Sequence, residues 1–395
     1  EYFGEIPTLA ITRGRRSEIR FKMGYAHFAN KDFANAEAMF EQIKDLRSDY
    51  YYPTNYYLGL CHFFEGDYQN AIEALRIANE DSRYQKYTPF YLAQIYFAEQ
   101  RYDELIAFVE PKLQERDIRD KEELSQLLGQ SYFEKGMYQE ALPHLKEYAQ
   151  RASKLREEEF YQLGYTQYRT GNYAEAVESL KPLSTVNSAI GQSAMFYMAD
   201  AYLKLGDKQN ALTALAEAKR MNFDPAITEE ALFNHGKLAY ELNIPKAAIN
   251  SLQELPLESQ YHLEAQKLIG EIAMNFRDYE EALKILANMP DKNPQLFEAY
   301  QKVSVLRAMQ ILREGGNPDE AKRLLVQSLQ YPYDPRSQAI ATYWLGDLAY
   351  REEDYRNSIN YLNQFMTMAK TMNNLPDESS IMTANYTQGY NYFKL

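Results

Sequence analysis

A small residue inside an apolar run returns along this chain at an almost constant interval. In FKMGYAHF, YYLGLCHF and QLLGQSYF this frame position is a glycine with aromatic or aliphatic residues around it. The frame position falls at Gly24, Gly59, Ala93, Gly129, Gly164, Ala199, Gly236, Gly270, Met309, Gly346 and Gly389. Subtracting successive numbers gives intervals of 35, 34, 36, 35, 35, 37, 34, 39, 37 and 43 residues. Such a period indicates one supersecondary unit that is copied along the whole chain.

Two further positions follow the frame position at fixed distances. Twelve residues after it come Ala36, Ala71, Leu105, Ala141, Ala176, Ala211, Ala248, Ala282, Ala321 and Ser358. Sixteen residues after it the side chain is always apolar: Phe40, Leu75, Val109, Leu145, Leu180, Leu215, Leu252, Leu286, Leu325 and Leu362. A polar turn such as EGDY, KGMY or TGNY separates the two apolar runs. Each unit therefore predicts two antiparallel amphipathic helices of about a dozen residues, joined by a tight turn.

The small residues predict where the two helices of a unit cross. Glycine or alanine on the first helix and alanine on the second leave room for the backbones to approach each other closely. An aromatic residue nine positions after the frame is expected to close one end of this crossing: Phe33, Tyr68, Tyr102, Tyr138, Tyr173, Tyr279 and Tyr355. A single hairpin cannot bury both of its apolar faces, whereas stacked hairpins can. The chain is therefore expected to be an all-α solenoid.

The combined pattern, L-G-x-x-Y/F followed by G-x-Y-x-x-A-x-x-x-L/F, resembles the tetratricopeptide repeat (TPR) family of the bacterial multi-repeat type. The resemblance covers residues 17–395 and implies a right-handed α-α superhelix of about ten helix-turn-helix units. It assigns 17–287 to eight units, 288–370 to two irregular units, and 371–395 to the start of a further, truncated unit. Residues 1–16 resemble the end of a preceding second helix. Both ends are therefore expected to be cut from a longer array.

Composition excludes several classes of function. The net charge of −13 and pI of about 5.1 argue against a nucleic-acid binder, which needs a basic face to neutralise phosphates. No apolar run reaches the roughly 18 residues of a membrane span. With one cysteine the chain forms no internal disulfide, and this leaves the cellular compartment open. The oligomeric state is equally open.

The sequence shows no constellation that predicts catalysis, a metal site or a cofactor site. The five histidines are scattered, and HExxH, CxxC, GxSxG and the phosphate-binding glycine motifs are all missing. Cys61 is followed directly by His62, yet both residues occupy positions that other units fill with core side chains. His27 and His62 take equivalent positions in adjacent units, and helices packed about 8–10 Å apart hold such positions too far apart for one zinc ion. We therefore expect no enzyme activity and no cofactor.

One stripe of the first helix is the expected partner-binding surface. The positions three before, one after and four after the frame share a helical face, and the family resemblance implies that this face lines a concave groove. The candidate residues are Phe21, Tyr25, Tyr56, Phe90, Gln94, Gln130, Tyr161, Tyr165, Tyr168, Asp200, Lys237, Tyr343 and Asp347. Rings with polar tips favour recognition of a protein or peptide. The alternative is that the flanking rings only pack against the next unit, with the central positions more exposed.

Three hypotheses about function remain open at this stage. The first is a non-catalytic scaffold that binds peptide or protein segments on the aromatic-rich face. The second is a permanent structural subunit of a bacterial envelope assembly, because Tyr331–Phe365 resembles the TPR units of envelope-maintenance and outer-membrane-assembly proteins, which slightly favours the periplasm or envelope over the cytoplasm. The third is the regulatory or substrate-binding part of a longer protein. The lysine/asparagine clamp of chaperone-tail binders is not present, since Phe21 and Tyr25 stand at its first positions.

Overall fold

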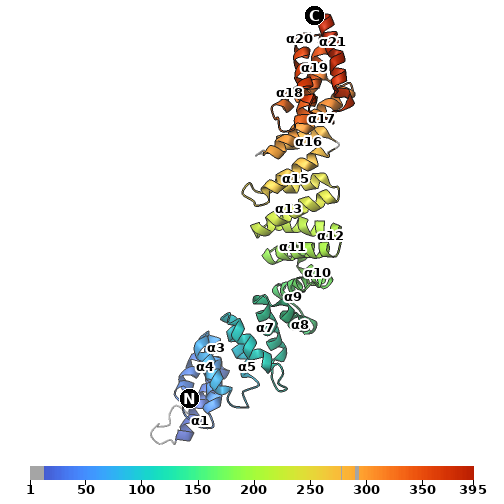
Figure 1. Ribbon diagram of the computed structural model, residues 1–395. Coiled ribbons are helices and arrows are strands. Elements are labelled where there is room, and N and C mark those ends of the chain that lie inside the picture. The colour runs from blue at the N-terminus through green and yellow to red at the C-terminus, as the bar shows by residue number, and fades with distance from the viewer. Residues whose placement is uncertain (1–12, 277, 290–292) are drawn as a thin grey trace. The chain divides into compact units, whose positions relative to one another are not determined.

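The computed structural model describes residues 13–276, 278–289 and 293–395, and all regular secondary structure in these ranges is helical (Figure 1). The helices are α1 (Arg13–Ala29), α2 (Phe33–Glu41), α3 (Tyr51–Glu65), α4 (Tyr68–Ala78), α5 (Thr88–Ala98), α6 (Tyr102–Lys112), α7 (Lys121–Glu134), α8 (Tyr138–Arg151), α9 (Glu157–Arg169), α10 (Tyr173–Leu180), α11 (Ala189–Lys204), α12 (Lys208–Met221), α13 (Pro225–Glu241), α14 (Pro245–Gln253), α15 (His262–Met274), α16 (Tyr279–Ala287), α17 (Pro294–Arg313), α18 (Pro318–Leu329), α19 (Pro335–Arg351), α20 (Tyr355–Ala369) and α21 (Ile381–Lys394). Two short 3₁₀ turns, Lys181–Thr185 and Asp377–Ser379, complete the fold. The predicted all-α class is confirmed.

Consecutive helices pair as hairpins, as the repeat predicts. The pairs α1 and α2, α3 and α4, α7 and α8, α13 and α14, and α19 and α20 are each in contact along the hairpin. The first helix begins at Arg13, before the boundary placed at residue 17. The remnant expected over residues 1–16 therefore falls partly on α1 and partly on residues 1–12, which lie outside the described residues.

The chain forms two compact units, which we describe separately. The first contains residues up to 186 together with 200–206, and the second contains 187–199 and 207–395. In the first unit the first helices of successive hairpins touch in the order α1, α3, α5, α7, α9. In the second unit the same contact runs through α13, α15, α17, α19 and α21. Stacking therefore buries the outer faces of each hairpin, which is how a repeat array makes a continuous core.

The frame glycine marks the helix crossing. A Cβ atom built at Gly59 would lie 2.7 Å from Cγ of Leu75, and one at Gly164 would lie 2.5 Å from Cγ of Leu180. The covering side chain is thus the apolar residue sixteen positions after the frame. The alanine twelve positions after the frame is completely buried beside it, as at Ala71. The crossing lies where the small residues predict it, and the leucine of the second helix fills the space beside the glycine.

The turn inside most of the described hairpins has the same backbone conformation. The residue seven positions after the frame adopts a positive φ there, which is 81° at Gly66 and 82° at Gly171. Lys31 and Glu353 adopt the same left-handed conformation, at 59° and 63°, although they carry a Cβ atom. In several hairpins the next residue is an aspartate that caps the second helix, as Asp67 does by accepting a hydrogen bond from the backbone N–H of Asn70 at 3.4 Å.

The aromatic residue nine positions after the frame contacts a ring of its own first helix. The ring centroids of Phe97 and Tyr102 lie 5.6 Å apart, and those of Phe133 and Tyr138 lie 5.9 Å apart. The partner ring stands four positions after the frame, so it belongs to the predicted stripe. The stripe residue four positions after the frame therefore also packs against the first residue of the second helix, at the turn end of the hairpin.

Two late frame positions differ from the others. A Cβ atom at Gly270 would meet the side chain of Ala299 on α17 at 3.4 Å, instead of a residue of its own second helix α16. A Cβ atom at Gly389 on α21 would meet no other atom within 4 Å. α21 packs on α19 and α20 through Ala384, Gln388 and the fully buried Asn391.

Candidate partner-binding surface

The three stripe positions lie on the first helix, beside the face that the second helix covers. We call this set, three before, one after and four after each frame position, the first-helix stripe. Its members differ in exposure from hairpin to hairpin, because the next hairpin covers some of them. The structure therefore separates the candidate residues into exposed, half-buried and buried ones.

The stripe of α1 forms an aromatic cluster with one exposed ring. Phe21 stacks near Tyr25 with a centroid distance of 6.3 Å and lies 5.0 Å from Tyr50. Tyr25 is 45% exposed, and its ring meets the edge of Tyr57 on α3 at 5.1 Å. Burial raises the pKa of Tyr57 to about 12, so its hydroxyl stays protonated at neutral pH. This surface is aromatic and uncharged.

The next part of the stripe lies on α3 and α5. Tyr56 is half-buried and stacks on Tyr84, with centroids 4.7 Å apart. Tyr84 belongs to the segment between α4 and α5, which the sequence pattern did not single out. Phe90 and Gln94 on α5 are half-buried as well, and the edge of Tyr91 meets the Phe90 ring at 5.5 Å. Packing against the next hairpin therefore accounts for much of this region.

The tyrosines of α9 form the most continuous part of the stripe. Tyr161 and Tyr165 stack with centroids 5.6 Å apart, and Tyr165 also meets Tyr138 at 5.5 Å. Arg169 donates a hydrogen bond from Nη1 to the Tyr165 hydroxyl at 2.8 Å. Tyr168 donates its hydroxyl hydrogen to Oδ2 of Asp200 at 2.7 Å, so these two candidates act as a pair. All four candidate side chains are half-buried.

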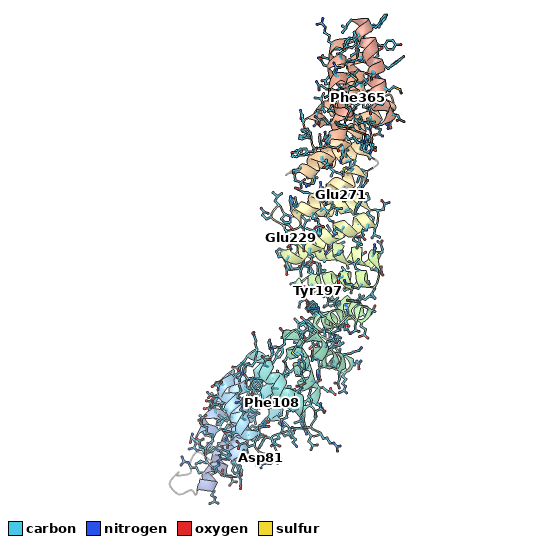
Figure 2. The ribbon with its side chains drawn as sticks, in the orientation of Figure 1. Asp81, Phe108, Tyr197, Glu229, Glu271 and Phe365 are labelled. Carbon is cyan, nitrogen blue, oxygen red and sulfur yellow. The ribbon has the colours of Figure 1, made fainter. Side chains whose placement is uncertain are left out.

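Two candidate residues are buried and offer no surface to a partner. Gln130 is 7% exposed, and its Nε2 donates to Oε1 of Gln162 on the next first helix at 3.1 Å. Tyr343 is 5% exposed, and its ring lies 5.1 Å from that of the fully buried Phe365 (labelled in Figure 2). The central positions were expected to be the more exposed ones, and Gln130 departs from that expectation because the next hairpin covers it.

Charged candidates occupy the stripe in the second unit. Lys237 is exposed, and its Nζ lies 5.0 Å from the centroid of the Phe233 ring and 3.7 Å from Oε1 of Glu264. Together with the exposed Glu271 (labelled in Figure 2), Lys237 and Glu264 line a small pocket of about 250 Å³. The pocket walls carry both signs of charge, so it favours no single ligand charge.

Asp347 on α19 gives a prediction about pH and stability. Burial raises the pKa of its carboxyl group, although Arg351 lies 2.8 Å away and partly offsets the effect. Because the pKa is raised in the folded state, the ionised carboxylate destabilises the folded protein, and this cost is present at pH 7 and absent below the ordinary pKa of the group. We therefore expect Asp347→Asn to raise the melting temperature at pH 7 and to change it less near pH 3. An equal shift at both values would contradict this reading.

The histidines and the cysteine occupy structural positions. Cys61 is completely buried, and burial raises its pKa to about 12, so it is not a reactive thiolate. His62 is 5% exposed, with Asp67 at 3.5 Å as the nearest carboxylate. His144 and His235 each share a hydrogen bond of 2.8 Å with a serine of the paired helix, Ser125 and Ser251. Among the described residues, no three histidine, cysteine, aspartate or glutamate side chains gather closely enough to hold a metal ion.

The stripe continues at two places that the sequence analysis did not list. The same offsets from Met309 give Leu306, Gln310 and Arg313 on α17, and those from Gly389 give Tyr386, Tyr390 and Phe393 on α21. The residues of α21 are strongly exposed, reaching 83% at Phe393. The sequence contains the signal for both places. It is the same spacing, counted from Met309, which is not a glycine, and from Gly389, the last frame position.

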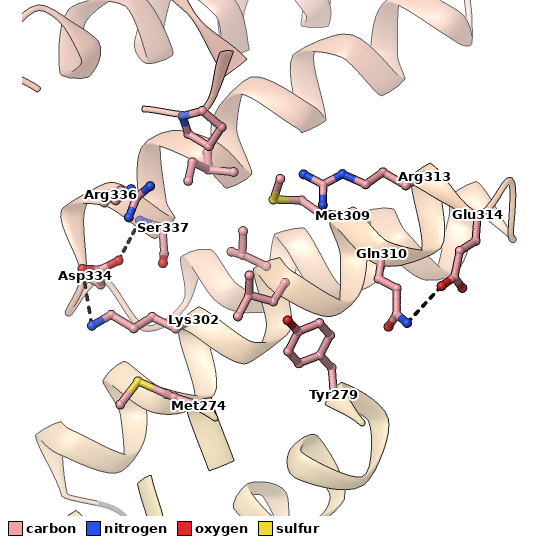
Figure 3. A pocket seen from close by; sticks show the side chains of 14 residues that line it. Met274, Tyr279, Lys302, Met309, Gln310, Arg313, Glu314, Asp334, Arg336 and Ser337 are labelled. Carbon is pink, nitrogen blue, oxygen red and sulfur yellow. Dashed lines mark hydrogen bonds and ion pairs between the residues drawn. The ribbon is translucent and has the colours of Figure 1, made fainter. Parts of the chain in front are cut away.

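The α17 stripe residues Leu306, Gln310 and Arg313 line a pocket of about 660 Å³ (Figure 3). Val305, Met309 and Ile340 are buried and make the floor apolar. Arg336 lies at one end of the pocket and Arg313 at the other (Figure 3). The side chains come from α15, α16, α17 and α19 and from the segment before α21. The volume is within the range of ligand pockets, roughly 300–1,000 Å³.

The fold defines a class, namely a repeat protein of stacked helical hairpins. The sequence matches the tetratricopeptide repeat family over residues 161–225 and 306–365. These matches show that the chain contains tetratricopeptide repeats, and the same glycine crossing recurs in hairpins outside the matched ranges, as at Gly59 and Gly236. No curated protein matches the sequence.

The chain is also similar to several solved structures, at low sequence identity. The structure of Naa15/Naa10 bound to HypK-THB is 14% identical with a TM-score of 0.43, over 96% of this chain and 61% of that chain. This chain thus spans less than two thirds of that relative's length. The C-terminal part of a TPR repeat-containing protein from Cytophaga hutchinsonii is 14% identical with a TM-score of 0.43, over 62% of this chain and 98% of that chain. Yeast Tom70 is 13% identical with a TM-score of 0.29, over 97% of both chains.

Across residues 13–276, 278–289 and 293–395, none of the helices combines the length and the apolar character that a bilayer crossing requires.

Proposed function

We propose that this chain is a non-catalytic interaction scaffold that binds peptide or protein segments along the first-helix stripe. The proposal rests on the difference between two neighbouring faces of the first helix. One face is occupied at the glycine crossing, whereas the neighbouring stripe carries aromatic rings that are only half-buried, as at Tyr161 and Tyr165. Stacked repeats create extended surfaces of this kind, which suit protein partners.

Aromatic side chains support a protein ligand more than a small molecule. A tyrosine offers a large rigid surface with few rotatable bonds and a polar tip that reaches water. The α9 tyrosines place three such rings on one helix, next to Arg169 and Asp200. A partner segment lying across this helix could bury the outer ring faces and hydrogen-bond the polar tips.

The test uses the chain as bait in a pull-down, followed by affinity measurement with the captured partner. We expect the triple variant Tyr161→Ala, Tyr165→Ala, Tyr168→Ala to weaken binding at least tenfold, since truncating aromatic anchors costs about 2 kcal/mol or more. The matched control replaces three half-buried aromatic residues away from the stripe in the same unit, Tyr52, Phe108 and Tyr148, by alanine. Full affinity in the stripe variant, with unchanged circular dichroism, would show that the stripe is not the binding surface.

The same experiment separates a scaffold from a permanent subunit of an assembly. A scaffold exchanges its captured partner for an excess of competing partner within minutes to hours. A permanent subunit retains fixed stoichiometric partners through the competition. Exchange of the labelled partner therefore supports the proposal, and its absence supports the structural-subunit alternative.

A further inference from the structure

The pocket on α17 indicates the chemistry of one partner segment, an inference that rests on the proposed function. The α17 side of the pocket runs from Lys302 to Arg313, which are eleven residues apart by subtraction of the residue numbers. At about 1.5 Å per residue this is about 16 Å. An extended peptide rises about 3.3 Å per residue, so roughly five peptide residues would cover the pocket.

The acidic side chains of the pocket already have partners within the protein. Asp334 accepts a hydrogen bond from the backbone N–H of Ser337 at 2.8 Å and thereby caps α19. Its other neighbour is Lys302, at 3.8 Å. Glu314 accepts a hydrogen bond from Nε2 of Gln310 at 3.0 Å (Figure 3). These carboxylates are therefore matched without a ligand.

The two arginines at the ends of the pocket differ in their ion pairs. Arg336 is exposed, and within the part of the chain that the structure describes it forms no hydrogen bond or ion pair. Arg313 is paired with Glu378, 65 residues further along the chain, whose Oε2 lies 2.9 Å from its Nη2. The pocket thus offers one unmatched cation and one that is held by a surface carboxylate.

The segment that carries Glu378 shows how an acidic segment meets this pocket. Pro376 lines the pocket wall, and Glu378 reaches Arg313 from the same short stretch. The preceding Leu375 packs on the apolar clusters around α17 to α20. A stretch of apolar residues followed by carboxylates therefore already lies at one rim, where an arginine and an apolar wall receive it.

We propose that this pocket binds an extended partner segment of about five residues that combines apolar and acidic side chains. The apolar side chains rest on Leu306, which lines the pocket and is 37% exposed, while carboxylates pair with Arg336 and Arg313. Glu378 competes with the ligand carboxylate for Arg313. Charge-assisted pairs of arginine with carboxylate are geometrically specific, which sets the polarity of the bound segment.

The test is a selection from a phage-displayed library of random heptapeptides on the 395-residue chain, followed by fluorescence anisotropy with the enriched peptides. We expect enriched sequences to hold apolar residues flanked by aspartate or glutamate. Arg336→Glu should weaken their binding about tenfold, since a hydrogen bond to a charged group is lost and like charges are opposed. Glu378→Gln should tighten binding several-fold, an effect that a purely structural role of Glu378 does not produce.

A matched control distinguishes the pocket from general electrostatics. The pair Arg323→Glu and Arg356→Glu changes the net charge as much as Arg313→Glu with Arg336→Glu, at exposed positions on α18 and α20 outside this pocket. Binding that is lost in the pocket pair and kept in the control pair supports the inference. Enriched peptides without acidic residues, peptides that bind the pocket pair unchanged, or no enrichment would overturn it. The scaffold proposal is judged separately, by the tyrosine variants.

Discussion

Replacing Gly236 by valine is expected to destabilise the second unit by about 3 kcal/mol. A Cβ atom at this position would lie 2.6 Å from Cγ of Leu252 and 3.2 Å from the backbone oxygen of Ala248. The two helices must therefore separate, and the buried contact of Leu252 is lost along the crossing. Urea unfolding followed by circular dichroism measures the change in the free energy of unfolding.

Two further variants test whether the loss comes from the crossing. Gly389→Val serves as the control, because a Cβ atom there meets nothing within 4 Å, and valine is a slightly better helix former than glycine. We expect its stability to stay within about 0.5 kcal/mol of the parent chain. In a double-mutant cycle, Gly236→Val should lower the free energy of unfolding less in the Leu252→Ala background than in the parent chain. Additive effects, or equal losses at Gly236 and Gly389, would contradict the crossing model.

His235 is expected to make the second unit sensitive to acid. Burial lowers its pKa from about 6.5 to about 4, so the folded protein favours the neutral ring, which shares a buried hydrogen bond with Ser251. Because the folded-state pKa is depressed, unfolding is accompanied by proton uptake in the interval between these values. The neutral histidine therefore contributes full stability above pH 6.5, and about 3 kcal/mol of it is lost as the pH falls to 4.

A matched replacement isolates this contribution. The equivalent positions in the hairpin of α3 and α4 hold Leu58 and Ala74, which are both buried. The double variant His235→Leu with Ser251→Ala copies that apolar pair and leaves no unmatched hydroxyl group. We expect the free energy of unfolding of the double variant to fall about 3 kcal/mol less between pH 6.5 and pH 4. If both proteins show the same pH slope, His235 is not the titrating group.

The repeat could be predicted from sequence because its information is local and periodic. A hairpin is specified within about 20 residues by a small frame residue, a turn that accepts a left-handed backbone, and an apolar residue sixteen positions on. Gly59 and Leu75 meet as that spacing requires, and Gly66 adopts the expected turn conformation. Helix Arg13–Ala29 began earlier than predicted, since helix boundaries are weakly encoded in sequence.

The candidate surface could be predicted only in part. The stripe followed from helical periodicity, and Tyr25 and Lys237 are exposed on it. The burial of Gln130 and Tyr343 could not be read from the same pattern. It depends on side chains of other helices, namely Gln162 on α9 and Phe365 on α20. Whether a stripe position faces solvent is thus decided by the helices that pack around it, from the same hairpin or from the next one.

The amino-acid sequence alone determined the all-α class, the hairpin unit and its crossing, because each depends on residues close together in one unit. It also indicated a binding protein without catalytic groups. Only the tertiary structure decided which stripe residues are open and where a pocket forms. The pocket needs Met309, Arg336 and Glu378 to converge from α17, α19 and the segment before α21. Such convergence depends on how successive hairpins pack, and no local spacing encodes it.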